Sequence, residues 1–277
     1  MKVIETVAEF RSRVAAVQRP LGLVPTMGAL HDGHLSLVNR ARADNATVVA
    51  SIFVNPKQFG LTEDLSSYPR DRDRDLSMLE DAGVDLVFAP MADEMYPHGF
   101  DTSVDVGRIA TRLEGEHRPG HFLGVATVVC KLLTIIRPDR AYFGQKDAQQ
   151  SLVIKRLNTD LNLGAEIVVC PTIREPDGLA LSSRNRYLNP AERKAATVLL
   201  CSLKLAEGMS TSNADEIRRQ MRELIGAEPL ATIDYVSIAD AETLHELHLV
   251  DRPALVSLAV RIGKTRLIDN VLLRPGA

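Results

Sequence analysis

Tryptophan is absent from this 277-residue sequence, and aromatic residues make up only 4% of it. No apolar run approaches the roughly 20 residues that a membrane-spanning helix needs, and the opening MKVIETVAEFRSRV interrupts its apolar residues with charges. An excess of basic charge is also missing, since 33 Lys and Arg face 36 Asp and Glu, for a net charge of −3. We therefore expect a cytoplasmic protein whose main partner is neither a membrane nor a nucleic acid.

Cysteines number only three, Cys130, Cys170 and Cys201, and each stands in an apolar stretch. Close pairs such as Cys-x-x-Cys, which zinc sites and disulfide frameworks use, do not occur. The three residues are therefore predicted to be buried, unreactive thiols. The remaining composition, 45% hydrophobic and 25% charged, is typical of a globular protein with one large domain or two ordinary ones.

Short β-rich runs alternate with helical patterns through the first 170 residues or so. The β-rich runs lie at 21–26, 47–54, 84–90, 140–144 and 165–170, and the helical patterns at 34–44, 75–83, 122–137 and 147–161. Nearly apolar strands separated by helix-length connections form parallel sheets covered on both faces. We predict an α/β fold with a Rossmann-like doubly wound sheet over residues 1–172, whose ligands bind at the C-terminal ends of the strands.

The pattern changes after Cys170, where PTIREPDGLALSSRNRYLNP is rich in Pro, Ser, Asn and charge. Helical patterns follow at 190–207 and 213–226, and strand patterns at 233–240, 254–262 and 264–273. This order predicts a second, smaller α+β domain over residues 173–277, acting as a lid.

The first strand runs into PTMGALHDGHLSL, residues 25–37. His31 and His34 are three residues apart as the next helix begins, so both imidazoles lie on one helix face beside amides that lack intrahelical partners. Such a helix start favours phosphate, and histidines can stabilise a departing pyrophosphate. Gly33 leaves room for a base or ribose against the backbone.

An arbitrary His-x-x-His pair is more often surface decoration or part of a metal site. The sequence holds a second pair, His245 and His248, which lacks the preceding strand, the turn and the glycines. We interpret that second pair as structural.

Two further clusters also hold side chains that can contact phosphate. FGQKDAQQ at 143–150 follows a strand and begins a helix, so Lys146 can contact phosphate, Asp147 can cap the helix, and Gln150 lies on the face of Lys146. LSSR at 181–184 places two hydroxyls and a guanidinium in the linking loop, where they can grip departing phosphates. Either cluster alone would equally fit ordinary capping or a solvated loop.

Together these clusters resemble the HIGH and KMSKS motifs of class I aminoacyl-tRNA synthetases and nucleotidylyltransferases. The strings LVPTMGALHDGH, SIFVNPKQF, YPRD, RPGHFLGVATVV, YFGQKDAQQ and DGLALSSRNRYL closely resemble the pantothenate synthetase (pantoate–β-alanine ligase) family, over nearly the whole chain. This resemblance implies an ATP-dependent amide ligase that joins pantoate to β-alanine through a pantoyl-adenylate. AMP and diphosphate would be released, in the supply of a coenzyme A precursor.

The resemblance also implies site residues. ATP would be bound by Met27, Gly28, Ala29, Leu30, His31, Asp32, Gly33, His34, Gly144, Gln145, Lys146, Asp147, Ile173, Leu181, Ser182, Ser183 and Arg184. The catalytic roles would fall to His34, His31, Lys146, Ser182, Ser183 and Arg184. Gln58 and Gln150 would hold pantoate, with Gln58 also on the β-alanine path, and Asn55, Tyr68, Arg118 and His121 match positions near the site. Gln145 replaces the Glu of many members, and Leu181 the Met of some.

The family further implies Mg²⁺ as a cofactor with ATP, and a homodimer, while the protein ligands of the metal remain open. The run RDRDRD at 70–75 predicts a solvated helix start, in which Asp75 is a weak candidate for holding magnesium. Three alternatives stay open: a nucleotidylyltransferase transferring AMP to a phosphate ester, a non-catalytic nucleotide-binding module, and a tRNA synthetase. The last lacks a basic anticodon-binding region.

Overall fold

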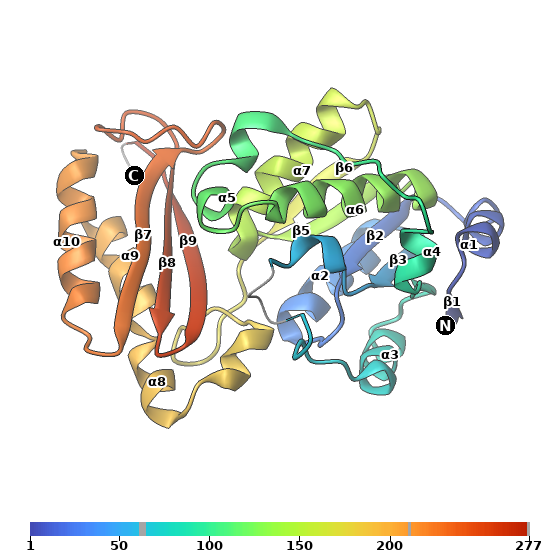
Figure 1. The fold of residues 1–277 in the computed structure, drawn as a ribbon, viewed down its shortest axis with the longest axis horizontal. Coiled ribbons are helices and arrows are strands. Elements are labelled where there is room, and N and C mark those ends of the chain that lie inside the picture. The colour runs from blue at the N-terminus through green and yellow to red at the C-terminus, as the bar shows by residue number, and fades with distance from the viewer. Residues whose placement is uncertain (61–64, 210–211, 276–277) are drawn as a thin grey trace. The chain divides into compact units, whose positions relative to one another are not determined.

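Two compact units make up the computed structural model, which describes residues 1–60, 65–209 and 212–275 (Figure 1). The first unit comprises Met1–Gln145 and Gln149–Pro171, and the second comprises Lys146–Ala148 and Thr172–Ala277. This grouping differs from the predicted domain ranges chiefly at residues 146–148. Their backbone is held by the second unit, because Asn270 Nδ2 donates to the Lys146 carbonyl at 2.8 Å.

A wholly parallel six-stranded sheet in the order β1-β4-β3-β2-β5-β6 forms the centre of the first unit. Its strands are β1 (Lys2–Ile4), β2 (Leu21–Thr26), β3 (Thr47–Ile52), β4 (Leu86–Phe88), β5 (Arg140–Gly144) and β6 (Glu166–Cys170). The sequence order reverses between β2 and β5, which is the topological switch point of a doubly wound sheet. The predicted Rossmann-like fold is therefore confirmed, with one addition: β1, only three residues long, was not predicted.

Helices connect these strands. They are α1 (Val7–Val14), α2 (Asp32–Asp44), α3 (Arg72–Asp81), α4 (Ala92–Met95), α5 (Glu114–His117), α6 (His121–Ile136) and α7 (Ala148–Asp160). Short 3₁₀ turns lie at η1 (Pro56–Gln58), η2 (Gly107–Ala110) and η3 (Gln145–Asp147). The four helical patterns predicted for this unit correspond to α2, α3, α6 and α7.

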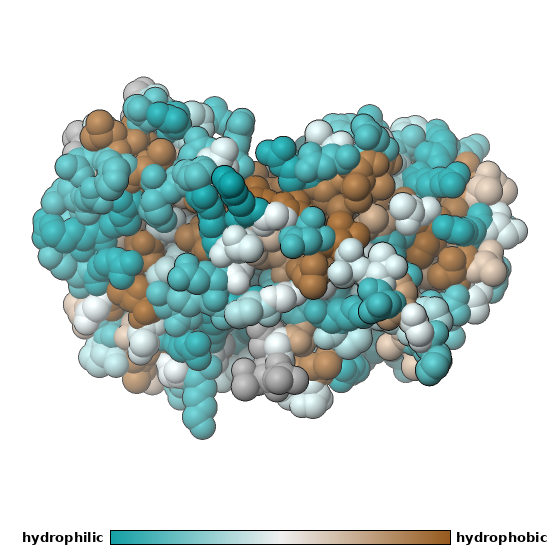
Figure 2. Space-filling view, turned by 45° about the horizontal axis from the view of Figure 1, so that its top comes forward, coloured by the Kyte–Doolittle hydropathy of each residue, from teal (hydrophilic) through white to brown (hydrophobic). Residues whose placement is uncertain are grey.

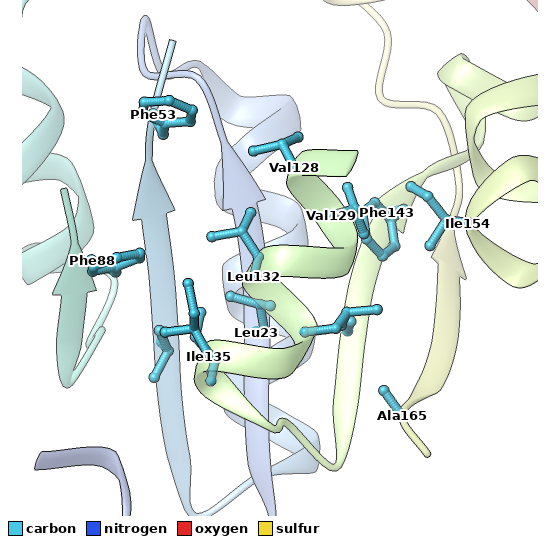
Figure 3. Packing of buried hydrophobic residues seen from close by; sticks show 14 of the residues in the cluster. Leu23, Phe53, Phe88, Val128, Val129, Leu132, Ile135, Phe143, Ile154 and Ala165 are labelled. Carbon is cyan, nitrogen blue, oxygen red and sulfur yellow. The ribbon is translucent and has the colours of Figure 1, made fainter. Parts of the chain in front are cut away.

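Successive strand residues point to opposite faces of the sheet and belong to two separate hydrophobic clusters, one on each face. Leu23, Val49 and Phe143 pack with α1, α6 and α7, and Figure 3 shows α6 over the strands, with Val128, Leu132 and Ile135 among the packed side chains. The next residues along, such as Val24 and Val48, pack with α2 and α3 instead. Burial on both faces explains why the strands read as nearly continuous apolar runs.

The second unit packs helices on an antiparallel sheet in the order β7-β8-β9. Its elements are η4 (Ser183–Tyr187), α8 (Pro190–Ala195), α9 (Val198–Gly208), α10 (Ala214–Gly226), β7 (Ala231–Asp240), β8 (Ala254–Ile262) and β9 (Thr265–Leu273). The α+β prediction is confirmed. The single helix predicted over 190–207 is two helices, since the chain turns at residues 196–197.

Of the three cysteines, Cys170 is buried and Cys130 half-buried, and burial raises the pKa of both thiols. Cys201 is exposed, so the prediction of three buried thiols is wrong there. Its apolar neighbours Leu199 and Leu203 point into the core, and position 201 between them falls on the outer face of α9.

Hydrophilic residues cover much of the face shown in Figure 2, with hydrophobic patches between them. Among the residues that the structure describes, no helix is both long and apolar enough to span a membrane.

Candidate active site

Three neighbouring parallel strands carry the predicted site segments of the first unit at their C-terminal ends. Met27–His34 follows β2, the Asn55–Gln58 turn follows β3, and Gln145 follows β5. Strand β2 pairs with β3 on one side and with β5 on the other. Segments far apart in the sequence therefore meet along one edge of the sheet, at its switch point.

The turn that leaves β2 has an unusual backbone. Gly28 and Ala29 both have positive φ, +80° and +52°. Thr26 closes the turn, since its Oγ1 donates to the Ser51 carbonyl of β3 at 2.7 Å and accepts from the Gly28 amide at 3.2 Å. This conformation needs glycine at position 28 for two reasons. Its φ is positive, and a side chain there would collide with a nearby carboxylate.

That carboxylate belongs to Asp75 on α3, which is 1% exposed. Its Oδ2 accepts from the Ala29 amide and its Oδ1 from the Leu30 amide, both at 2.8 Å. Position 75 is therefore not part of a solvated helix start, as the charge run had predicted. Both carboxylate oxygens hold the loop, so the suggestion of a magnesium ligand gains no support.

His31 and His34 lie together, with ring centroids 4.1 Å apart and planes tilted by 40°. His31 is the N-cap of α2, and its Nδ1 accepts from the Gly33 amide at 3.1 Å. An accepting Nδ1 carries no proton, so in neutral His31 the proton is on Nε2. His31 can then donate from Nε2 while it caps the helix.

The sequence predicted amides without intrahelical partners at this helix start, and three amides there are bonded by side chains instead. Asp75 takes the amides of Ala29 and Leu30, and His31 takes that of Gly33. The His34 amide donates to the His31 carbonyl at 2.8 Å. Because those backbone donors are engaged, contact with a phosphate here would come from the two imidazole side chains.

The segment after β3 brings a glutamine to the same edge. Gln58, 9% exposed, closes turn η1, and its Nε2 lies 3.1 Å from Met27 Sδ. This turn packs tightly on α6, since a Cβ built on Gly124 would lie 2.2 Å from the Lys57 carbonyl oxygen. Gln58 and the Met27–His34 segment are thus in direct contact.

Three further predicted positions lie in this unit. His121, the first residue of α6, contacts the Gln58 carbonyl through Nδ1 at 2.8 Å, and Arg118 contacts His121 Nε2 at 3.0 Å. Tyr68 is buried at 5% exposure against Phe59, with ring centroids 5.8 Å apart. Arg118 therefore reaches Gln58 through His121. Tyr68 instead packs against Phe59, the residue after Gln58.

The two glutamines of DAQQ differ in role. Gln149 is 5% exposed, and its amide bonds the backbone of the segment before α5, at Ile109, Arg112 and Glu114, over 2.7–3.0 Å. Gln150 is half-buried and has no such anchoring bond among the described residues. Gln149 is therefore structural, and Gln150 is the one available to a ligand.

Lys146 and Asp147 belong to the second unit. Lys146 Nζ lies 3.6 Å from Asp147 Oδ1, and the lysine side chain is 20% exposed. The carboxylate therefore offsets part of the lysine charge, while the backbone of Lys146 is fixed by Asn270.

The linking loop of the second unit folds back on itself. The Leu181 amide donates to the Ile173 carbonyl at 2.9 Å, and residues 174 and 180 form an antiparallel bridge. Ser182 caps η4 by accepting from the Arg184 amide at 3.3 Å. Ile173 and the Leu181–Arg184 segment are thereby brought together.

Ion pairs hold this loop to its own unit. Arg174 makes a bidentate pair with Asp269 of β9 at 2.6 and 3.0 Å, with Asp269 only 2% exposed. Arg193 pairs with Glu175 at 2.8 Å and with Asp177 at 2.5 Å, and its hydrogen bond lowers the pKa of Asp177. Sequence reasoning found none of these anchors, because each joins residues distant in the sequence.

The structure thus gathers the predicted residues into two groups, one in each unit. The first holds Met27, Gly28, Ala29, Leu30, His31, Asp32, Gly33, His34, Asn55, Gln58, Tyr68, Arg118, His121, Gly144, Gln145 and Gln150, and the second holds Lys146, Asp147, Ile173, Leu181, Ser182, Ser183 and Arg184. Within the described residues, no cluster of three His, Cys, Asp or Glu could hold a metal ion. In the second pair, His248 Nδ1 lies 3.0 Å from an Asp215 carboxylate oxygen, and its side chain is exposed.

The family model for pantoate–β-alanine ligase matches residues 2–272. This chain belongs to the pantoate–β-alanine ligase family. It is therefore an enzyme of the ligase class, and the match extends through both units.

Pantothenate synthetases of other organisms are similar to this chain over nearly its full length. The pantothenate synthetase of Roseiflexus sp. (strain RS-1) is 63% identical over 99% of each chain, and that of Herpetosiphon aurantiacus is 53% identical over 99% of this chain and 100% of the relative. A crystal structure of pantothenate synthetase from Thermus thermophilus has a TM-score of 0.93 at 49% identity, covering 98% and 99% of the two chains. The ligase from Francisella tularensis, complexed with β,γ-ATP and β-alanine, has a TM-score of 0.82 at 36% identity, covering 98% and 97%.

Proposed function

We propose that this chain makes pantothenate from pantoate and β-alanine at the expense of ATP, in two steps. In the first, a pantoate carboxylate oxygen attacks the α-phosphorus, the bond to the β-phosphate oxygen breaks, and diphosphate leaves. In the second, the deprotonated β-alanine amine attacks the acyl carbon, and AMP leaves with the electrons of the carbon–oxygen bond. The observation that carries the proposal is the family match over residues 2–272, joined to site segments at the ends of β2, β3 and β5.

The first step needs charge neutralisation, since a carboxylate approaches a triphosphate. We assign this to His34, Lys146 and the loop of Ser182, Ser183 and Arg184, with His31 donating from Nε2. The assignment names His31 and His34 of the first unit and Lys146, Ser182, Ser183 and Arg184 of the second. Fixed donors of this kind stabilise charge as it develops on the departing diphosphate.

Pantoate recognition falls to Gln58 and Gln150. Amide groups held in one geometry discriminate hydroxyl and carboxylate oxygens by position. Gln58 is fixed by its neighbours, and Gln150 stands free of the structural bonds that occupy Gln149. Gln58 also contributes to the path of β-alanine.

Mg²⁺ is proposed to enter with ATP. This ion prefers oxygen ligands and usually keeps several waters while binding substrate phosphates through few protein carboxylates. The donors at this site fit that mode, because the buried carboxylate nearest the loop, Asp75, is occupied by two amides. The ion would supply phosphate-charge neutralisation when bound.

A homodimer, implied by the family resemblance, and a cytoplasmic location, expected from the composition, remain predictions. Light scattering on the purified chain tests the first, with a mass near twice 30.4 kDa expected. Cell fractionation tests the second.

The function is tested by incubating the chain with Mg²⁺, ATP and pantoate, with and without β-alanine. Diphosphate should form in both mixtures, whereas free AMP should accumulate over many turnovers only with the amine. A product that retains AMP on a phosphate ester would instead identify a nucleotidylyltransferase. ATP binding without turnover would identify a binding module.

A further inference from the structure

Asn55 lies in the segment that follows β3, and its side-chain amide bonds two backbone groups. Its Oδ1 accepts from the Lys57 amide at 3.2 Å, and its Nδ2 donates to the Gly124 carbonyl at 3.1 Å. A backbone N–H can only donate and a carbonyl can only accept, so both bonds form in only one of the two amide orientations. Asn55 is 1% exposed, and water does not offer its amide an alternative.

This orientation determines what the neighbours of Asn55 do. The Tyr96 hydroxyl, 2.8 Å from Asn55 Oδ1, must donate to it. Asn55 Nδ2 lies 3.1 Å from Gln58 Oε1, so the glutamine accepts with its oxygen. Gln58 Nε2 therefore faces away from Asn55, toward the thioether of Met27 at 3.1 Å.

The backbone of Gln58 is fixed by a second set of contacts. Arg118 can only donate, so His121 Nε2 accepts from it and Nδ1 carries the proton. His121 Nδ1 then donates to the Gln58 carbonyl at 2.8 Å. The backbone carbonyl and the side-chain Oε1 of Gln58 are both held. The side-chain NH2 group, Nε2, is therefore the part that faces the Met27–His34 segment.

We propose that Tyr96 is a positioning residue for acid-substrate recognition, acting through Asn55 to keep Gln58 oriented as a hydrogen-bond donor. This inference rests on the proposed function, in which Gln58 contacts pantoate. A donor at this position suits an acceptor oxygen of a short hydroxy acid, carboxylate or hydroxyl. Tyr96 was not among the sequence-predicted site residues, since it lies 38 positions beyond Gln58 in the sequence.

Tyr96 is suited to this role because it stays a donor. Partial burial raises the pKa of its hydroxyl, so the proton is retained throughout the physiological range. Its ring is held by Phe53 and Phe100, with centroids 6.0 and 5.1 Å away. Tyr96→Phe would keep those ring contacts and remove only the hydroxyl.

Tyr96→Phe is the test, and Tyr142→Phe is its matched control. The Tyr142 hydroxyl also bonds an asparagine, accepting from Asn45 at 2.7 Å and donating to Asp44 at 3.1 Å, and none of the described bonds links it to Gln58. Loss of one neutral hydrogen bond should raise KM for pantoate by about 3- to 10-fold in the Tyr96→Phe variant. KM for ATP should stay within about 2-fold of wild type, and Tyr142→Phe should change neither constant.

The outcomes separate this inference from the proposed function. If the wild-type chain makes no pantothenate, the proposed function fails. If the wild type is active and Tyr96→Phe keeps the wild-type KM for pantoate, or raises both KM values equally, the positioning role is overturned.

Gln58→Glu provides a second measurement, independent of Tyr96. The glutamate can still accept from Asn55, yet it offers no donor, so pantoate-dependent diphosphate release should fall by about 100-fold or more while ATP binding persists. Near-wild-type diphosphate release would show that the oxygen of Gln58, and not its amino group, faces the substrate.

Discussion

A Cβ built on Gly28 would lie 2.8 Å from Asp75 Oδ2, the oxygen that accepts from the amide of Ala29. The space that a side chain would need at position 28 is occupied by the group that holds the loop. Glycine and aspartate are thus required together, although the two lie far apart in the sequence.

Gly28→Ala should destabilise the first unit by about 2 kcal/mol or more, through left-handed strain and loss of the Asp75 hydrogen bonds. Urea unfolding measures this, and diphosphate release should fall with it. Gly208→Ala is the control, because nothing lies within 4 Å of its Cβ position and φ is not positive there. Equal stability of the two variants would contradict the close contact at Gly28.

Asp75→Asn should weaken ATP use, because the asparagine nitrogen replaces one of the two oxygens that accept from the Ala29 and Leu30 amides, and it cannot accept. Leaving one buried donor unpaired costs about 1–3 kcal/mol of stability. Asp71→Asn on the same helix is the control, since asparagine caps a helix as well as aspartate does. Restoration of Asp75→Asn activity by excess Mg²⁺ would indicate a metal ligand and contradict loop positioning.

Gln149→Ala and Gln150→Ala should have opposite consequences. Gln149→Ala removes three bonds to backbone groups and should cost about 2–3 kcal/mol in the free energy of unfolding. Gln150→Ala should leave stability within about 0.5 kcal/mol, while KM for pantoate rises and ATP binding survives. An equal loss of ATP affinity in Gln150→Ala would argue against its assignment to pantoate.

His34→Ala and Lys146→Ala should each slow adenylation by about 10² or more, the effect of losing one donor to developing charge. Single-turnover release of diphosphate is the measurement. His248→Ala is a control for loss of an imidazole, since that side chain is 87% exposed and pairs only with surface Asp215 in the described contacts. Near-normal diphosphate release in either site variant would remove that residue from the charge-stabilising set.

We predict that the Tyr142 hydroxyl makes the fold less stable at alkaline pH. Burial is the largest cause that raises the pKa of its hydroxyl to about 12. A pKa raised above the unfolded value of about 10 means that the folded state holds the proton more tightly. Its contribution to stability is therefore full below the unfolded pKa and is lost as pH rises toward the folded one. The free energy of unfolding is measured with urea at pH values below and above the unfolded pKa. Between these pH values it should fall less for Tyr142→Phe than for wild type, and equal falls would refute this.

Several elements could be predicted because their signals are local. The run LGLVPT at 21–26 is β2, and the helical spacing after His31 is α2. The strand β1 was missed because KVI carries a charged residue and is followed by charged and polar ones, whereas β4, equally short, lies in a longer and mostly apolar run at 84–90. The break between α8 and α9 was missed because the apolar spacing continues through it.

The candidate site was found in part for the same reason. His31, His34 and Lys146 stand in short strings at strand ends, where ligands of doubly wound sheets bind. The string containing Asp75 led to a different expectation, a solvated charge run, since nothing in RDRDRD reveals that one carboxylate is turned inward to two amides.

By itself the sequence determined the α/β class, the smaller α+β region, and the family to which the chain belongs, because periodicity and motif strings are properties of neighbouring residues. Only the tertiary structure decided that the ends of β3, β2 and β5 adjoin, that Asp75 holds the Gly28 turn, and that Tyr96 reaches Gln58 through Asn55. Those relationships join residues tens of positions apart, and they depend on strand order and on which hydrogen-bonding group finds a partner when water is excluded.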